Sequence, residues 1–279
     1  MKAASFDYQR PPTLQAALRL LSDAGGSAKV MGGGQSLGPM LNLRLTRPKQ
    51  VIDVSALEEL RGVAQDGDAI RIGAAVTHAE IEDGAHALLR GGLLQSVAGG
   101  IAYRAVRNRG TVGGSLAHAD PAADWVLAAS ALGAEVEVAS QAGTRRVPMD
   151  GFMQGAYTTV LGEGELLVAL RVPQLGPAAR WGYFKFCRKT GEFAEASCAA
   201  VFDPARKLAR VVLGALDGAP QALPALAAQV ARSGAVPSRD AIAAAVAVAA
   251  ASKDAVDRKL LAVAVERCLA QVLTLESVQ

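Results

Sequence analysis

The sequence predicts an α+β protein in which two lobes of helices and strands are followed by a C-terminal lobe built from a sheet and helices. Helix and strand signals alternate along the first 173 residues. Seventeen of the 29 glycines lie between Gly25 and Gly114, and no aromatic residue follows Phe202. These shifts in composition indicate two different architectures joined end to end.

Each element of the first part has a local signal. Pro12–Thr13 opens a helix that Gly25 and Gly26 end. Thr77 can cap a helix that begins at His78, because Glu80 completes a capping box. The other expected elements are a helix over 124–132 and strands over 28–31, 50–54, 69–73, 134–138 and 166–172.

The second part begins after an expected linker over residues 175–180. Strands are predicted over 181–186, 197–202 and 209–213. Two helices are expected to close the chain, the first beginning at Pro237–Ser238. The second helix is predicted to present one apolar face, made of Val256, Leu260, Leu261, Ala264, Val265, Cys268, Leu269, Val272 and Leu273.

Composition excludes several classes of protein. With 51% hydrophobic residues the chain can form a core, and a net charge of +3 without a basic block disfavours nucleic-acid binding. The longest uncharged apolar run has 11 residues, 241–251, whereas a membrane-spanning helix needs roughly 20. No signal-peptide pattern opens the sequence, and the three cysteines lie far apart, so a cytoplasmic location with reduced thiols is expected.

The first chemical motif is the glycine loop that follows the strand at 28–31, with residues 30–37 reading VMGGGQSL. Consecutive glycines allow backbone N–H groups to approach phosphate oxygens, although a purely structural turn has the same composition. The spacing matches neither a Rossmann fingerprint nor a P-loop. Residues Gly34, Ser36 and Gly38 fit the G-x-S-x-G elbow of serine hydrolases. That alternative is disfavoured because no histidine follows His118 in the chain.

The second motif is longer, with residues 106–124 reading VRNRGTVGGSLAHADPAAD. It offers glycines for close contact, hydroxyls at Thr111 and Ser115, and carboxylates at Asp120 and Asp124. Two such loops, 81 residues apart from Gly32 to Gly113, suit a long ligand with a central diphosphate, and a dinucleotide is the natural candidate.

These two motifs resemble those of the FAD-binding medium subunits of molybdenum hydroxylases, as in carbon monoxide dehydrogenases and separate-subunit xanthine dehydrogenases. The first loop is similar to A-G-G-x-S-L-x-P and the second to R-N-x-G-T-I-G-G-N/S-L-A-H-A-D-P-A-A-D. The resemblance continues through 184–194 and 256–260, so it spans nearly the whole chain. The chain departs from the usual pattern at four positions, which are Met31, Tyr103, Ser115 and Asp257.

The resemblance implies a two-lobed FAD-binding domain of the p-cresol methylhydroxylase type over residues 1–175, with lobes of about 1–57 and 58–175. A C-terminal flavoprotein lobe would occupy residues 176–279. It also implies that FAD is held by residues of both loops and by positions beyond them. These are Lys29, Val30, Met31, Gly32, Gly33, Gly34, Gln35, Ser36, Leu37, Thr111, Gly114, Ser115, Ala117, His118, Asp120, Asp124, Leu167 and Lys185.

Some of these residues have alternative interpretations. Lys185, which matches a position near the flavin ring, could be a solvated strand lysine. His118 and Asp120 could in principle bind a metal, but no suitable second histidine is evident, so no metal site is expected. Arg104, Arg107 and Arg109 could neutralise the diphosphate, face a partner or simply be solvated.

No residue pattern supplies a substrate base, a molybdenum ligand or a cluster ligand. The resemblance therefore implies partners, namely a molybdopterin-binding large subunit and a [2Fe–2S] small subunit, in a dimer of heterotrimers. This chain would pass electrons from the clusters through FAD to an external acceptor. A stand-alone FAD-dependent oxidase is the alternative. The Ala-rich C-terminal helices and the surface at residues 104–109 are expected docking sites. The substrate and the terminal acceptor are left open.

Overall fold

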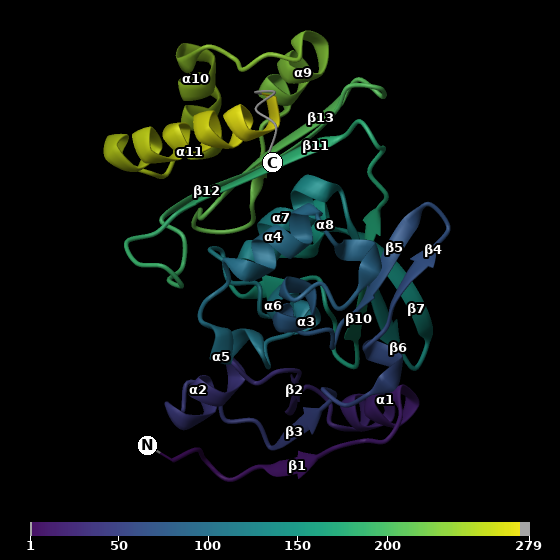
Figure 1. Ribbon diagram of the computed structural model, residues 1–279. Helices are drawn as coiled ribbons and strands as arrows, with labels where there is room; N and C mark the ends of the chain where they lie inside the picture. The colour runs from purple at the N-terminus through teal and green to yellow at the C-terminus, as the bar shows by residue number, and fades with distance from the viewer. Residues whose placement is uncertain (1, 274–279) are drawn as a thin grey trace.

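The computed structural model describes residues 2–273 and stacks three sheets along the length of the molecule (Figure 1). A three-stranded sheet at the N-terminal end has the order β1-β3-β2. A five-stranded sheet with the order β4-β5-β10-β6-β7 follows in the middle, and a four-stranded sheet with the order β11-β12-β13-β14 lies at the C-terminal end. A short hairpin pairs β8 (Met153–Gly155) with β9 (Thr158–Thr159).

The N-terminal sheet consists of parallel strands β1 (Asp7–Gln9), β2 (Ala28–Met31) and β3 (Gln50–Asp53). Helix α1 (Leu14–Asp23) connects the first two strands, and α2 (Leu37–Asn42) follows the second. The Thr13 hydroxyl caps α1 by accepting from the Ala16 N–H at 3.2 Å. Because the strands are parallel, their carboxyl ends meet at one edge of this sheet.

The middle sheet is antiparallel and consists of β4 (Val63–Asp66), β5 (Ala69–Gly73), β10 (Leu166–Pro173), β6 (Glu135–Ser140) and β7 (Gly143–Pro148). Six helices accompany it, namely α3 (His78–Glu82), α4 (Leu93–Gly99), α5 (Arg104–Arg107), α6 (Val112–His118), α7 (Asp124–Leu132) and α8 (Met149–Phe152). Short 3₁₀ turns occupy Glu58–Leu60 and Ala87–Leu89. Every residue of α7 is buried, with Trp125 fully enclosed in the core.

The C-terminal sheet consists of β11 (Arg180–Phe186), β12 (Ala196–Asp203), β13 (Leu208–Gly214) and β14 (Gln221–Ala222). Helices α9 (Pro224–Ser233), α10 (Arg239–Ala249) and α11 (Ala255–Leu273) complete this lobe. All eight residues of β12 are buried. Cys198 and Ala200 face the core formed with α11, whereas Ala199 packs with Leu127 of α7. Small side chains therefore suit a strand that is covered on both faces.

Most of the predicted elements are confirmed to within two residues at their ends, and the capping box at Thr77 and Glu80 is present. The prediction for the last helix is wrong at Val256, which is 75% exposed. Burial along α11 begins only at Leu261, so its first turn lies beyond the packed part of the helix. Helix α9, which precedes the two expected helices, was not predicted from the sequence. Within residues 2–273, no helix combines the length and the hydropathy needed to cross a membrane.

The contact between β11 and α11 depends on a missing side chain at Gly182. A Cβ atom there would lie 2.6 Å from the Cys268 carbonyl oxygen and 2.7 Å from Val272 Cγ2. We expect Gly182→Ala to lower the free energy of unfolding by about 1–3 kcal/mol in urea titrations, because helix and sheet must separate. Gly155→Ala is the control, since nothing lies within 4 Å of its Cβ position, and it should change stability by less than about 0.5 kcal/mol. Equal stability of the two variants would contradict the close contact.

Candidate functional site

The two glycine loops pack directly against each other. A Cβ atom on Gly33 would lie 1.8 Å from the Arg109 carbonyl oxygen and 2.8 Å from the Gly110 Cα. A Cβ atom on Gly32 would lie 2.7 Å from the Thr111 hydroxyl. Real Cβ atoms do not approach other atoms this closely, so the loops can meet only because both positions are glycine. The sequence predicted that both loops serve one ligand, but not that their backbones touch.

The second loop is held rigidly on the middle lobe. The Val112 and Gly113 N–H groups donate to the Val76 and Ala74 carbonyls at 3.0 and 2.9 Å. The His78 N–H donates to the Gly110 carbonyl at 2.9 Å. At the start of α6 the Thr111 hydroxyl accepts from the Gly114 N–H at 3.1 Å. The loop geometry is therefore set by backbone bonds to residues 74–78 and does not require a ligand.

The first loop presents a row of free donors. Among residues 2–273, the backbone N–H groups of residues 32–37 have no protein acceptor. Gly34 has φ +70°, a conformation that bends the loop and that glycine adopts without strain. A curved run of unpaired N–H groups is a concave binding surface for an anion such as phosphate.

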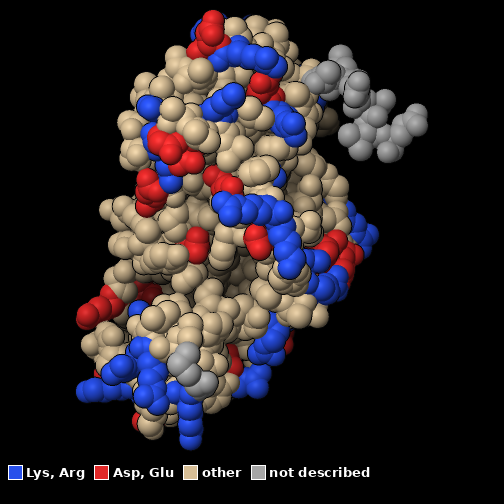
Figure 2. Space-filling view, turned by 90° about the vertical axis from the view of Figure 1, so that its left-hand side faces the viewer, with Lys and Arg blue, Asp and Glu red and all other residues tan. Residues whose placement is uncertain are grey.

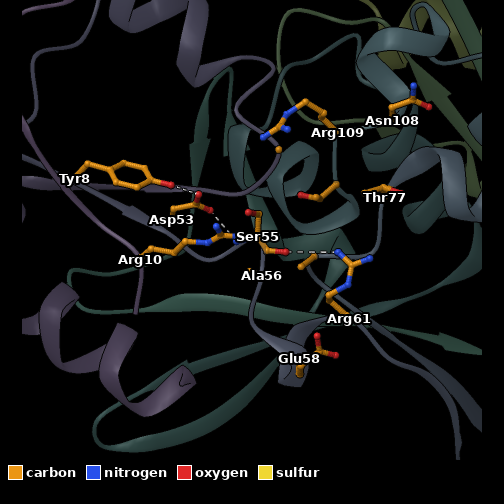
Figure 3. A pocket seen from close by; sticks show the side chains of 13 residues that line it. Tyr8, Arg10, Asp53, Ser55, Ala56, Glu58, Arg61, Thr77, Asn108 and Arg109 are labelled. Atoms are coloured by element: carbon orange, nitrogen blue, oxygen red, sulfur yellow. Dashed lines mark hydrogen bonds between the residues drawn. The ribbon is translucent and has the colours of Figure 1, made fainter. Parts of the chain in front are cut away.

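A polar cleft of about 500 Å³ lies beside the two loops (Figure 3). Its walls come from the N-terminal sheet, the 3₁₀ turn after β3, and both glycine loops. The lining residues are Tyr8, Arg10, Gly33, Asp53, Ser55, Ala56, Glu58, Arg61, Ala75, Thr77, Asn108, Arg109 and Thr111. The N-terminal lobe contributes to this cleft at the carboxyl ends of its parallel strands, the edge where ligands bind in open parallel sheets.

Asp53 is the buried anion of this cleft. It accepts a hydrogen bond from the Tyr8 hydroxyl and another, of 2.9 Å, from the Ser55 N–H (Figure 3). Burial alone would raise the pKa of Asp53, but these hydrogen bonds outweigh it and hold the pKa below its ordinary value. The same bond raises the pKa of Tyr8, so Tyr8 remains a donor. The cleft thus has a fixed negative charge at Asp53, and the carboxylate of Glu58 also lines it.

Three arginines line the same cleft, namely Arg10, Arg61 and Arg109. Arg61 is engaged with Glu80 at 2.6 Å. Arg10 and Arg109 make no ion pair within the part of the chain that the structure describes. Their guanidinium groups are therefore available to a negatively charged ligand in the cleft.

A second polar cluster joins the middle lobe to the C-terminal lobe. Asp124, at the start of α7, accepts from the Tyr183 hydroxyl at 2.6 Å and pairs with Lys185 Nζ at 3.1 Å. Burial raises the pKa of Asp124, although the Lys185 charge opposes this effect. Burial and the neighbouring carboxylate raise the pKa of Tyr183 well above its usual range. Lys185 is therefore a paired, mostly buried cation, and the solvated-lysine interpretation is wrong.

The predicted site residues occupy several different environments. Gly32, Gly33, Thr111 and Gly114 lie together where the loops meet. Lys29 is exposed on β2. Leu167 is 3% exposed and packs in the hydrophobic core. The remaining predicted residues have intermediate or full exposure and lie at the end of β2 (Val30 and Met31), in the first loop (Gly34, Gln35 and Ser36), at the start of α2 (Leu37) and in α6 (Ser115 and Ala117).

His118 and Asp120 gather around a third residue, Tyr157. The Tyr157 hydroxyl lies 3.1 Å from an Asp120 carboxylate oxygen, and its ring centroid is 5.1 Å from that of His118. Within residues 2–273 no cluster of three or more His, Cys, Asp or Glu side chains could hold a metal ion. These contacts make His118 part of an aromatic and hydrogen-bonded cluster at the end of α6.

The structure also decides between several earlier alternatives. Ser36 has φ −102° and ψ −48°, which is ordinary helical backbone and not the strained turn of a nucleophile elbow. Arg104 and Arg107 are committed to ion pairs with Glu82 and Asp83. Of the three arginines in this segment, Arg109 alone lines the cleft.

Sequence reasoning missed the N-terminal wall of the cleft, formed by Tyr8, Arg10, Asp53 and Ser55. A usable signal was present. The strand predicted over 28–31 runs directly into three glycines, and the strand predicted over 50–54 carries Asp53 near its end. In a parallel sheet such carboxyl ends lie side by side. The short first strand, which carries Tyr8 and is followed by Arg10, had no comparable signal.

Comparisons with known proteins bear on this site. The profile described as the FAD-binding domain in molybdopterin dehydrogenase matches residues 4–175. The carbon monoxide dehydrogenase medium chain of Hydrogenophaga pseudoflava is 39% identical over 196 residues, covering 70% of this chain and 68% of the relative. The nicotine 6-hydroxylase medium subunit of Paenarthrobacter nicotinovorans is 35% identical over 227 residues, covering 80% and 79%. A solved carbon monoxide dehydrogenase from H. pseudoflava that lacks the Mo-pyranopterin moiety matches with a TM-score of 0.89 and 32% identity over 98% of both chains.

The second glycine loop rests on a buried neutral histidine, which makes stability depend on pH. His78 Nδ1 accepts from Trp125 Nε1 at 3.0 Å, and burial followed by the Arg107 charge lowers the pKa of His78 to about 4. The unfolded chain, with a histidine pKa of about 6.5, takes up a proton first as pH falls. The neutral-histidine contribution is therefore complete above about pH 6.5 and decreases toward pH 4.

We expect the free energy of unfolding to drop by about 2 kcal/mol between pH 7.5 and pH 5 because of this one residue. In His78→Asn, whose amide oxygen can replace Nδ1 as the acceptor, the drop should shrink by that amount. Urea titrations of both proteins at the two pH values measure it. Identical pH profiles for the two proteins would show that His78 is not responsible.

Proposed function

The chain belongs to the family of FAD-binding domains of molybdopterin dehydrogenases, and from this premise we propose that it is the electron-transfer flavoprotein subunit of a molybdenum hydroxylase. It is an oxidoreductase subunit whose cofactor is FAD. In the proposed role it receives electrons from [2Fe–2S] clusters of a partner subunit and passes them through FAD to an external acceptor. FAD supplies the redox chemistry when bound.

The observation that carries this proposal is the donor set around the glycine loops. Six consecutive backbone N–H groups, from Gly32 to Leu37, lack protein acceptors among the described residues. Arg109 and Arg10, which make no ion pair there, line the adjoining cleft. A diphosphate needs many donors and positive charge at close range, so these residues fit the central part of FAD.

We propose roles for the predicted residues within this arrangement. The segment from Lys29 to Leu37 binds the diphosphate, and Thr111, Gly114, Ser115 and Ala117 approach it from the second loop. His118 and Asp120, held by Tyr157, fix the far end of α6. Asp124 and Lys185 lie toward the flavin ring. Since Leu167 is buried in the core, only its backbone is suited to a cofactor contact.

Asp124 is proposed to act mainly through Lys185. Both carboxylate oxygens of Asp124 already have partners, Tyr183 on one and Lys185 on the other. Lys185 Nζ is therefore held in one place, with a further contact to the Gly100 carbonyl at 3.4 Å. A fixed cation beside a flavin ring stabilises the negative charge that reduction adds.

The division of the chain and its partners are also proposed. Residues 1–57 and 58–175 would form the two lobes that hold FAD, and 176–279 the C-terminal lobe. The three separate sheets support this division.

The relatives are named as medium subunits, which supports a large molybdopterin-binding subunit and a small [2Fe–2S] subunit as partners, in a dimer of heterotrimers. Carbon monoxide and nicotine appear in the names of those relatives, so the substrate is expected to be set by the large subunit. Free thiols at all three cysteines are consistent with a cytoplasmic location.

Purification tests the proposal directly. The full chain, tagged and expressed in its own host, should be yellow, contain FAD, and copurify with a molybdenum-containing chain and a [2Fe–2S] chain. Absorption spectra, metal analysis and electron paramagnetic resonance measure these three properties. A lone yellow protein that oxidises a substrate by itself would instead support the stand-alone oxidase, and a folded protein without affinity for FAD would overturn both functions.

The contact at Gly33 gives a specific prediction for cofactor binding. Gly33→Ala must push the two loops apart, since its Cβ would overlap the Arg109 carbonyl. We expect FAD affinity to fall at least about 100-fold, as measured by titration of the apoprotein monitored by flavin fluorescence. Gly62→Ala, where nothing lies within 4 Å of the Cβ position, is the control and should bind FAD like the wild type. Normal FAD binding by a folded Gly33→Ala protein would contradict the assignment.

The ion pair of Asp124 and Lys185 gives a prediction for the flavin potential. Lys185→Met removes the fixed cation, so the midpoint potential of bound FAD should become more negative by about 30 mV or more, which is about 1.4 kcal/mol for two electrons. Lys185→Arg keeps the charge and should shift the potential much less. Dye-equilibrated titrations of the wild-type and variant holoproteins measure the midpoint potentials. Equal potentials in the wild type and Lys185→Met would place Lys185 away from the flavin.

A further inference from the structure

The segment that contains the first glycine loop and α2 has an unusual charge distribution. Between Asp23 and Asp53 the chain contains no acidic residue, but it contains Lys29, Arg44, Arg47 and Lys49. Among residues 2–273, neither these four cations nor Lys2 forms an ion pair. By contrast, Arg104, Arg107, Arg145 and Arg171 are all paired with carboxylates. The positive charge of this segment is therefore not neutralised by any carboxylate among the described residues.

Two leucines are exposed among these cationic side chains. Leu43 is 50% exposed and Leu45 is 71% exposed. They flank Arg44, whose Nε donates to the Lys2 carbonyl at 3.0 Å and thereby holds the N-terminal segment against the loop. We call Lys2, Leu43, Arg44, Leu45, Arg47 and Lys49 the α2 patch. Figure 2 shows Lys and Arg side chains gathered on the lower part of this face.

The backbone at Arg44 is the third unusual feature. Helix α2 ends in a Schellman motif, in which the Arg44 N–H donates to the Leu41 carbonyl at 3.0 Å and the Leu45 N–H to the Met40 carbonyl at 2.9 Å. The left-handed residue of this motif is usually glycine, but here Arg44 has φ 57°. The fold thus accepts backbone strain at a position where a large cationic side chain is displayed in place of glycine.

An exposed apolar centre with a charged, arginine-containing rim is typical of a protein–protein interface. Because all its charges are positive, the surface suits an acidic partner. The other expected docking sites are less suited to one, since Arg104 and Arg107 are already neutralised by Glu82 and Asp83. The Ala-rich helix α10 displays Val248 at 82% exposure, but its first turn contains an acidic residue, Asp240, and its last turn contains no basic residue.

We propose that the α2 patch is the docking surface for an acidic face of the [2Fe–2S] subunit, an inference that rests on the proposed function. The patch directly follows the loop proposed to bind the FAD diphosphate, since α2 begins at Leu37. A chain docked here is beside the cofactor-binding lobe, as electron transfer from its clusters requires. Opposite charges on the two faces would steer the encounter and would make it sensitive to salt.

The test uses the full chain and the [2Fe–2S] subunit that copurifies with it, identified by its electron paramagnetic resonance spectrum. In R44E/R47E the Kd for that subunit should rise about tenfold or more, and the wild-type affinity should fall as salt is raised. The matched control is K207E/R232E, which reverses two exposed cations on the C-terminal lobe and should bind like the wild type. FAD content and melting temperature of both variants should equal those of the wild type.

Arg44→Gly separates docking from folding. Glycine relieves the left-handed strain, so this variant should melt at or above the wild-type temperature while binding the [2Fe–2S] subunit severalfold more weakly. Unchanged affinity in R44E/R47E would overturn the docking site but leave the proposed function intact. If the wild-type chain copurified with no [2Fe–2S] subunit at all, the proposed function itself would fail. If R44E/R47E lost binding to phosphatidylcholine–phosphatidylserine vesicles but bound the [2Fe–2S] subunit like the wild type, the patch would be assigned to a membrane surface. That result would overturn the proposal.

Discussion

The arrangement of this protein depends on the direct backbone contact between its two glycine loops. Gly33 meets the carbonyl of Arg109, so the N-terminal and middle lobes approach as closely as two main chains can. The second loop is anchored by backbone bonds to residues 74–78, and the first is attached to the end of a parallel strand. The same contact leaves a row of N–H groups, which have no acceptor among residues 2–273, beside a cleft lined with arginine. The contact that joins the two lobes therefore also shapes the proposed anion site.

The second joint of the molecule is polar and buried. Asp124 of α7 is bound by Tyr183 and Lys185, both from β11, so the C-terminal lobe is tied to the middle lobe by a charged group away from water. If the two lobes moved apart, the buried Asp124 carboxylate would lose its partners and remain uncompensated, which is unfavourable. The buried polar pair therefore favours one relative orientation of the lobes. Apolar packing of Leu127 against Ala199 continues the same contact.

The sequence predicted the elements well where the signal was local. The strand at 28–31, the helix at 124–132 and the capping box at Thr77 each depend on a few adjacent residues, and all three are present. The contacts that make the site come from distant parts of the chain. Tyr8 reaches Asp53 across 45 residues and Tyr183 reaches Asp124 across 59, and neither pairing follows from spacing along the chain. Val256 was misjudged for a related reason, because periodicity predicts a face but not where the covering sheet ends.

The position of β12 has a consequence for how the molecule can be divided. This strand is a middle layer, with α11 on one side and α7 on the other, so the middle lobe uses it as an outer wall. A fragment ending at residue 175, where the family profile stops, would leave Leu127 and Ala131 uncovered in water. The exposed apolar surface would promote self-association of this fragment. Residues 1–175 therefore cannot be treated as an independent domain. Strand β12 is therefore part of the hydrophobic core of the middle lobe as well as of the C-terminal lobe.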